Sequence, residues 1–68
     1  MSDWNIISGG VEHTPSTSKF WFYTYTDTNN VDGPKGMKLD PSWDIYFTSE
    51  EDILRTATSV WENHLRVA

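Results

Sequence analysis

The chain has 68 residues, no cysteine, and five basic against ten acidic residues, which gives a net charge of −5 at neutral pH. This length allows one domain, residues 1–68, with a single small core, and the lack of cysteine excludes disulfides and thiolate metal sites. The negative charge disfavours nucleic acids and anionic membranes as partners, so a protein partner fits better.

Membrane insertion and secretion are not indicated by any part of the sequence. No apolar run reaches the length needed to span a bilayer, and Met1-Ser2-Asp3-Trp4 lacks the basic and apolar regions of a secretion signal. We therefore expect a cytoplasmic protein with no membrane partner.

The first predicted element is a β-hairpin. Residues 3–8 contain Trp4, Ile6 and Ile7 and are typical of a short strand, and Gly9-Gly10 suits a tight two-residue turn. Residues 11–14 would form the returning strand, which ends at the polar turn 15–18.

A long aromatic strand is predicted at residues 19–26, where aromatic and β-branched side chains run without a break. Alternation places Phe20 and Phe22 on one face and Trp21, Tyr23 and Tyr25 on the other. Since one helix covers only one face of a sheet, we expect the second face to remain as an exposed aromatic surface.

Residues 27–41 are predicted to be a polar connection without regular structure, because turn-forming residues recur along it. Met37 and Leu39 are the residues expected to attach it to the core. The following segment, 43–47, is predicted to be a short strand, with Trp43, Ile45 and Phe47 facing inward and Asp44 and Tyr46 facing outward.

A carboxyl-terminal helix is predicted from Thr48-Ser49-Glu50-Glu51, in which a hydroxyl cap is followed three residues later by a glutamate. Its apolar residues fall on one stripe at helical spacing. That stripe consists of Ile53, Leu54, Ala57, Val60, Trp61, His64 and Leu65. We expect it to cover one face of the sheet, with His64 at its edge as a partly buried side chain or a cap for the last carbonyl groups.

Catalytic and cofactor-binding patterns are not found. No serine lies in a Gly-x-Ser-x-Gly turn, and neither His13 nor His64 has companion ligands at metal-site spacing. The sequence therefore predicts a protein that is not an enzyme and has no catalytic residue, cofactor or metal.

Two stretches resemble known families. Residues 43–52 resemble the last strand and the helix of the three-stranded-sheet DNA-binding domains of arm-type recombinases and plant ethylene-response factors, which read DNA with arginines and tryptophans of the sheet. Residues 20–25 contain no arginine. A second set is similar in order to the signature of GYF-type adaptor domains, which bind proline-rich peptides: Trp21-x-Tyr23, Gly33-Pro34, Met37, Trp43 and Tyr46-Phe47. In that family a helix follows Gly-Pro, whereas Gly36 and Pro41 prevent a long one here. We assign the chain to neither family.

The sequence as a whole predicts an α+β domain: a three- to four-stranded antiparallel meander packed on one face by a single carboxyl-terminal helix. We expect a non-catalytic protein-binding module, a small regulator or inhibitor that acts through an exposed aromatic sheet face with an acidic rim. The predicted partner-binding residues are Trp21, Tyr23, Tyr25, Tyr46, Asp27, Asp32 and Asp44. The alternatives are a nucleic-acid-related role, by direct binding or by acidic mimicry of DNA, and a self-associating structural protein that forms a homodimer.

Overall fold

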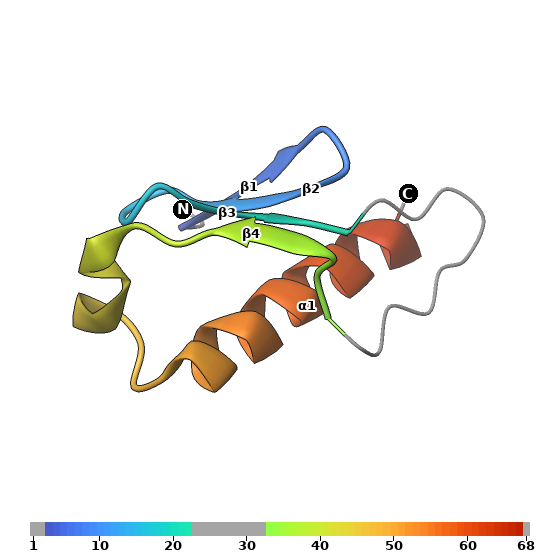
Figure 1. The fold of residues 1–68 in the computed structure, drawn as a ribbon. Coiled ribbons are helices and arrows are strands. Elements are labelled where there is room, and N and C mark those ends of the chain that lie inside the picture. The colour runs from blue at the N-terminus through green and yellow to red at the C-terminus, as the bar shows by residue number, and fades with distance from the viewer. Residues whose placement is uncertain (1–2, 23–32, 68) are drawn as a thin grey trace.

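The computed structural model describes residues 3–22 and 33–67 of the chain. It contains a four-stranded antiparallel sheet in the order β1-β2-β3-β4, with one helix on one side of it (Figure 1). The elements are β1 (Trp4–Ile7), β2 (Gly10–His13), β3 (Ser18–Trp21), β4 (Gly36–Lys38), the 3-10 helix η1 (Pro41–Ile45) and α1 (Glu50–Val67). The predicted α+β meander with a carboxyl-terminal helix is confirmed.

The first hairpin turns one residue earlier than predicted. Ile7 pairs with Gly10, so the turn consists of Ser8 and Gly9, and Gly9 has a φ of 75°, a conformation that favours glycine. Gly10 already belongs to β2. A side chain there would collide with the carbonyl oxygen of Phe20 on the neighbouring strand, so a glycine is needed at this position for a different reason.

The described part of the aromatic stretch forms β3, where Phe20 is fully buried, and Phe22 directly after the strand is fully buried too. The backbone N–H of Phe22 donates to the carbonyl of Gly9 at 2.8 Å, which continues the pairing past the end of β3. The predicted placement of these two rings on the inner face is therefore confirmed. Residues 23–26 of the predicted strand lie outside the described residues.

Two predictions between β3 and α1 are wrong. The connection contains β4, which pairs with β3 from Gly36 to Lys38, and residues 43–47 do not form a strand. The carboxylate of Asp40 accepts the N–H of Ser42 at 3.0 Å and Pro41 supplies a fixed φ, so the chain begins η1 instead.

The side chains of this region are also arranged differently from the prediction. Ile45 is 75% exposed rather than buried, and Met37 is 45% exposed. Leu39, Trp43 and Phe47 do pack against the core as expected.

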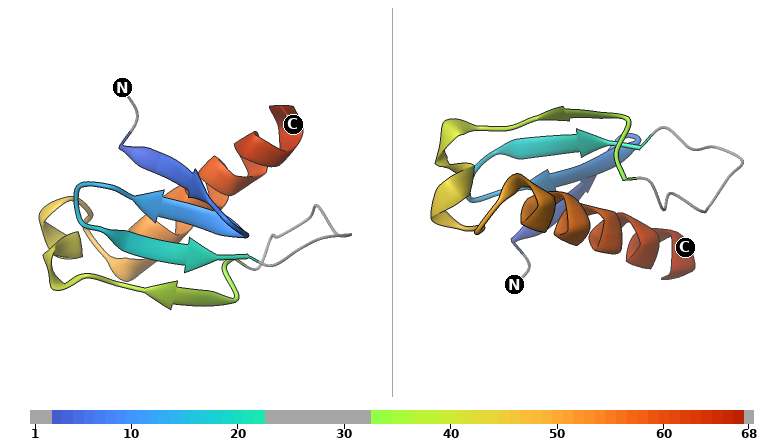
Figure 2. Two further views of the ribbon diagram at one scale, coloured as in Figure 1. Left: turned by 90° about the horizontal axis from the view of Figure 1, so that it is seen from above. Right: turned by 60° about the horizontal axis from the view of Figure 1, so that its bottom comes forward.

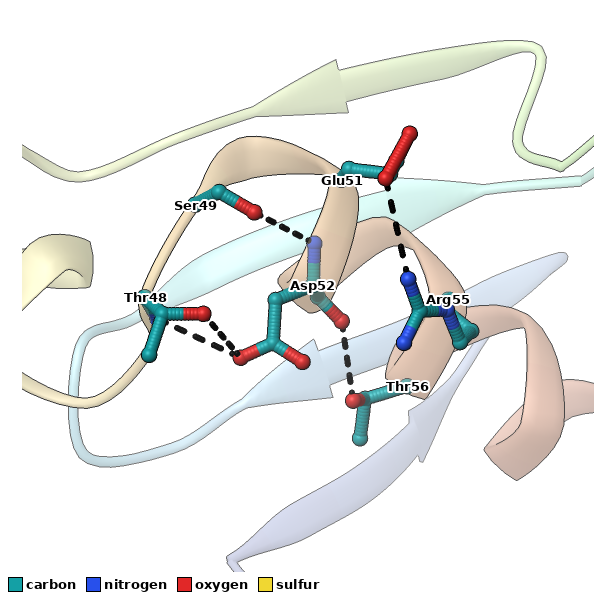
Figure 3. Close-up of polar contacts among 6 residues, drawn as sticks. All are labelled: Thr48, Ser49, Glu51, Asp52, Arg55 and Thr56. Atoms are coloured by element: carbon teal, nitrogen blue, oxygen red, sulfur yellow. Dashed lines mark hydrogen bonds and ion pairs between the residues drawn. The ribbon is translucent and has the colours of Figure 1, made fainter.

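The amino-terminal cap of α1 lies one residue later than predicted (Figure 3). Ser49 Oγ accepts the N–H of Asp52 at 3.1 Å, and the Asp52 carboxylate accepts the N–H of Thr48 at 3.2 Å. The cap therefore pairs Ser49 with Asp52. The carboxylate of Glu51 instead lies 3.7 Å from the guanidinium of Arg55.

The core lies between the sheet and α1, which packs mainly against β2 and β1 (Figures 1 and 2). Its buried apolar residues are Val11, Phe20, Phe22, Ile53, Ala57 and Trp61. The rings of Phe22 and Trp61 are stacked, with centroids 5.3 Å apart and planes inclined by 2°. The predicted inner stripe of the helix is confirmed, since Leu54, Val60 and Leu65 also pack against this cluster.

Replacing Gly10 and Gly36 by alanine provides a matched pair of tests. A Cβ on Gly10 would overlap the backbone of Phe20, whereas one on Gly36 would lie 3.9 Å from Trp21 Cε3, an ordinary contact. Gly10→Ala should destabilise by about 3 kcal/mol or more and Gly36→Ala by less than about 1 kcal/mol in urea unfolding. Equal losses for the two variants would contradict the proposed overlap.

Replacing Ser49 by alanine should lower the free energy of unfolding by about 1 kcal/mol, because the N–H of Asp52 loses its acceptor. The matched control is Ser59→Ala, an exposed position inside α1, where alanine should be neutral or slightly stabilising. Urea unfolding followed by circular dichroism measures both. A Thr48→Ala variant as damaging as Ser49→Ala would contradict the assignment of the cap.

Candidate functional site

The sheet face directed away from α1, called the outer face from here on, is the candidate site (Figure 2, left view). Residues opposite one another on antiparallel strands share a face, so the strand register defines which residues belong to it. Two rows of side chains lie there. One is Asn5, Glu12, Lys19 and Lys38, and the other is Ile7, Gly10, Trp21 and Gly36.

Trp21 is the aromatic residue of the outer face among the described residues. It is half-buried and lies between two glycines, Gly10 on β2 and Gly36 on β4. Its Cε3 atom is 3.9 Å from the position that a Cβ of Gly36 would take, so the indole lies beside the backbone of β4. No side chain projects from either of these two cross-strand neighbours, and the indole remains partly exposed.

Positive charge accumulates beside this ring. Two of the three lysines, Lys19 and Lys38, are directly opposite each other in the outer-face row next to Trp21, and Lys35 precedes β4. Lys19 Nζ is 3.8 Å from a Glu12 carboxylate oxygen. Lys38 is exposed, and within residues 3–22 and 33–67 it forms no ion pair. The rim of the outer face is therefore basic on its β3–β4 side.

Three of the predicted contact residues are described by the structure, and they lie in different parts of the fold. Trp21 is opposite Gly10, at one end of β2. Tyr46 is 48% exposed, but its ring lies 5.2 Å from that of His13, at the other end of β2 and on the inner face. Asp44 is exposed on η1.

Tyr46 and Asp44 are therefore not brought to the outer face beside Trp21. The remaining predicted residues, Tyr23, Tyr25, Asp27 and Asp32, lie outside the described residues.

A buried polar cluster around His13 was not predicted. His13 Nδ1 is 2.8 Å from Ser16 Oγ, which is 2.9 Å from Ser18 Oγ, and all three residues are at most 3% exposed. The N–H of Asp40 donates to Ser18 Oγ at 3.1 Å. The cluster thus joins the turn between β2 and β3 to the segment that leads into η1.

Aromatic rings close this cluster from the other sides. The centroid of the His13 ring lies 4.9 Å from those of Trp4 and Phe47. A serine hydroxyl so enclosed offers no surface to a substrate, so the arrangement supports a structural role rather than nucleophilic catalysis. The sequence did contain the signal, because alternation from the buried Val11 places His13 on the same inner face.

Burial lowers the pKa of His13 from its usual value of 6.5, because the imidazolium form is poorly solvated, and the nearby Asp3 carboxylate opposes this effect. The neutral form of His13 is therefore the one that the fold favours.

The part of the chain that the structure describes holds no group of three or more histidine, aspartate or glutamate residues able to bind a metal ion. Within the same residues, no helix is long and apolar enough to cross a membrane.

No family model, curated protein or solved structure matches the chain.

The stability of the protein should depend on the protonation of His13. Below a pH of about 6.5 the unfolded chain binds a proton at His13 that the folded chain resists, so the free energy of unfolding should fall as the pH drops. The slope should reach at most about 1.4 kcal/mol per pH unit.

This dependence can be measured by urea unfolding between about pH 7.5 and pH 5.5, where His13→Gln should lose the slope. His64→Gln is the matched control, because it keeps His13 and should retain the dependence. A slope that persists in His13→Gln would show that another group causes it.

Proposed function

We propose that the protein is a cytoplasmic, non-catalytic protein-binding module, a small regulator or inhibitor, which docks a partner on the outer face of its sheet. The observation that supports this best is the accessible Trp21 indole, held between Gly10 and Gly36 on a face that α1 does not cover. Tryptophan is enriched at the centres of protein interfaces because it provides a large contact area with few rotatable bonds.

The charges beside Trp21 suggest the chemistry of the partner. Lys38 is exposed and, among the described residues, forms no ion pair, and Lys19 lies next to it on β3. A partner surface with carboxylates around an apolar centre would complement this arrangement. The acidic residues predicted for the rim are either on η1, as Asp44 is, or outside the described residues, so the proposal now depends on the basic rim.

A second candidate function uses the same face. Single-stranded nucleic acids bind to aromatic rings flanked by positive charge, and the register brings Trp21, Lys19 and Lys38 to one surface. The net charge of −5 opposes this binding at long range. A gel-shift titration at low salt distinguishes the two functions, because direct binding to nucleic acid should weaken steeply as salt is added.

Replacing Trp21 by serine should reduce partner capture at least about tenfold, because the central contact of the outer face is lost. The assay immobilises the protein and quantifies the partner retained from a lysate of the source organism, normalised to the folded fraction by circular dichroism. Lys38→Glu should also reduce capture. Arg66→Glu, the same charge change at an exposed position near the end of α1, should not. Full capture by a folded Trp21→Ser variant would contradict the proposal.

A further inference from the structure

The helix α1 covers the sheet unevenly, and the uneven cover leaves a groove beneath β4, the last strand of the sheet. Four residues form one cross-strand row on the inner face: Ile6, Val11, Phe20 and Met37. The central two, Val11 and Phe20, are 0% exposed, whereas Ile6 is 40% and Met37 45% exposed. Because α1 packs against β2 and β1, the inner side of β4 extends beyond it.

The space between β4 and α1 is an open groove of about 420 Å³. Its apolar lining comes from Pro34, Met37 and Leu54. Its polar lining consists of Glu51, Arg55, Thr58, Ser59 and Glu62. This volume falls in the range of small-ligand sites and is large enough for one apolar side chain with its neighbouring backbone.

The edge of β4 that does not pair with β3 borders the same groove. In the described sheet β4 pairs only with β3, so its second edge has backbone N–H and C=O groups without a strand partner. Exposed edges of this kind bind extended peptides by strand addition, in which the backbone provides affinity and alternate side chains provide specificity.

We propose that β4 binds an extended peptide as a fifth strand, with an apolar side chain in the groove and a carboxylate on the outer face. A peptide residue opposite Met37 shares the inner face and enters the groove, while its neighbour opposite Lys38 lies on the outer face. On that face Glu12 is paired with Lys19, and Lys38 has no such carboxylate among the described residues. A glutamate or aspartate on the peptide supplies the carboxylate partner for Lys38.

The charges in the groove determine which peptide side chains should be apolar and which acidic. Glu51 is paired with Arg55, and Glu62 leaves the lining with a net charge of −1, so an apolar side chain is favoured over an acidic one in the groove. One neighbour of the apolar residue lies opposite Lys38 and the other opposite Gly36, so a peptide with acidic, apolar, acidic residues places a carboxylate at Lys38 in either strand direction. A second copy of the chain fits less well, since antiparallel pairing of two β4 edges would bring together the exposed Lys35 and Lys38 of both copies, and edge lysines oppose such pairing.

This site shares Lys38 with the surface around Trp21 and differs from it in the inner-face contacts of the groove at Met37 and Leu54, which the Trp21 surface does not use. The probe is an acetylated and amidated peptide, Thr-Thr-Glu-Leu-Glu-Thr-Thr, titrated into the isotope-labelled full chain and followed by NMR. We expect shifts at Met37, Leu54 and Thr58 and close contacts between the leucine methyls and the Met37 methyl. Replacing the leucine by serine should weaken binding about tenfold or more.

Variants of the protein test both faces. Met37→Glu, at an exposed position, should abolish binding by placing a charge in the groove. Lys38→Glu should weaken the glutamate peptide about fivefold and bind Thr-Thr-Lys-Leu-Lys-Thr-Thr better than the wild type does. Arg66→Glu is the matched control on α1 and should change neither affinity.

Backbone pairing is tested separately with two peptides N-methylated at alternate residues. Only one of the two sets of amides can face β4, so one peptide should bind and the other should not. Equal binding of both, equal binding of glutamate and lysine peptides, or no shift at β4 up to the solubility limit would overturn the proposal. So would a wild-type dimer in sedimentation velocity that Met37→Glu dissociates, because the edge would then belong to a second copy.

Discussion

The structure depends on one packing constraint, which is that a single helix must cover a four-stranded sheet. The stripe of Ile53, Ala57 and Trp61 packs against the centre of the inner face, where Val11 and Phe20 are sealed from solvent. The width of one helix, about 10 Å with its side chains, is smaller than the width of four strands spaced about 4.8 Å apart. The edges of the inner face and the whole outer face therefore need another cover or remain open.

One end of the inner face has such a cover, and it is not α1. The row of Trp4, His13 and Ser18 is closed by the segment around η1, whose Phe47 lies against Trp4 and His13. Because this row contains polar groups, closing it requires hydrogen bonds, and the chain from His13 through Ser16 and Ser18 to the N–H of Asp40 supplies them. The same bonds hold the connection after β4 against the sheet, so the cluster positions η1 and, through it, the start of α1.

Periodicity was sufficient to predict α1, the first three strands and the two buried phenylalanines, because each of these elements has an apolar face of its own. Periodicity failed where contacts with the rest of the fold determine the local structure. β4 is only three residues, Gly36 to Lys38, too short to show an alternating pattern, and it becomes a strand because β3 is beside it. The alternation of Trp43, Ile45 and Phe47 resembles a strand, but the local bond from Ser42 to Asp40 favours a 3-10 turn and leaves Ile45 outside.

The candidate site was predictable to a similar extent. Alternation along 19–26 was enough to expect Trp21 opposite the buried face, whereas its neighbours depend on strand register, which the sequence did not reveal. Lys19 and Lys38 are 19 positions apart and become direct cross-strand neighbours only through the pairing of β3 with β4.

The pairing of these two lysines also changes how the net charge of the chain should be interpreted. Charges farther away than about 8 Å are largely screened at physiological salt, so a partner in contact with β4 interacts with these lysines rather than with the average of the chain. The carboxylates of Glu50, Glu51 and Asp52 belong to the first turn of α1, on the other side of the sheet. Within the described residues, Lys19 and Lys38 therefore lie on the side of the sheet opposite these three carboxylates.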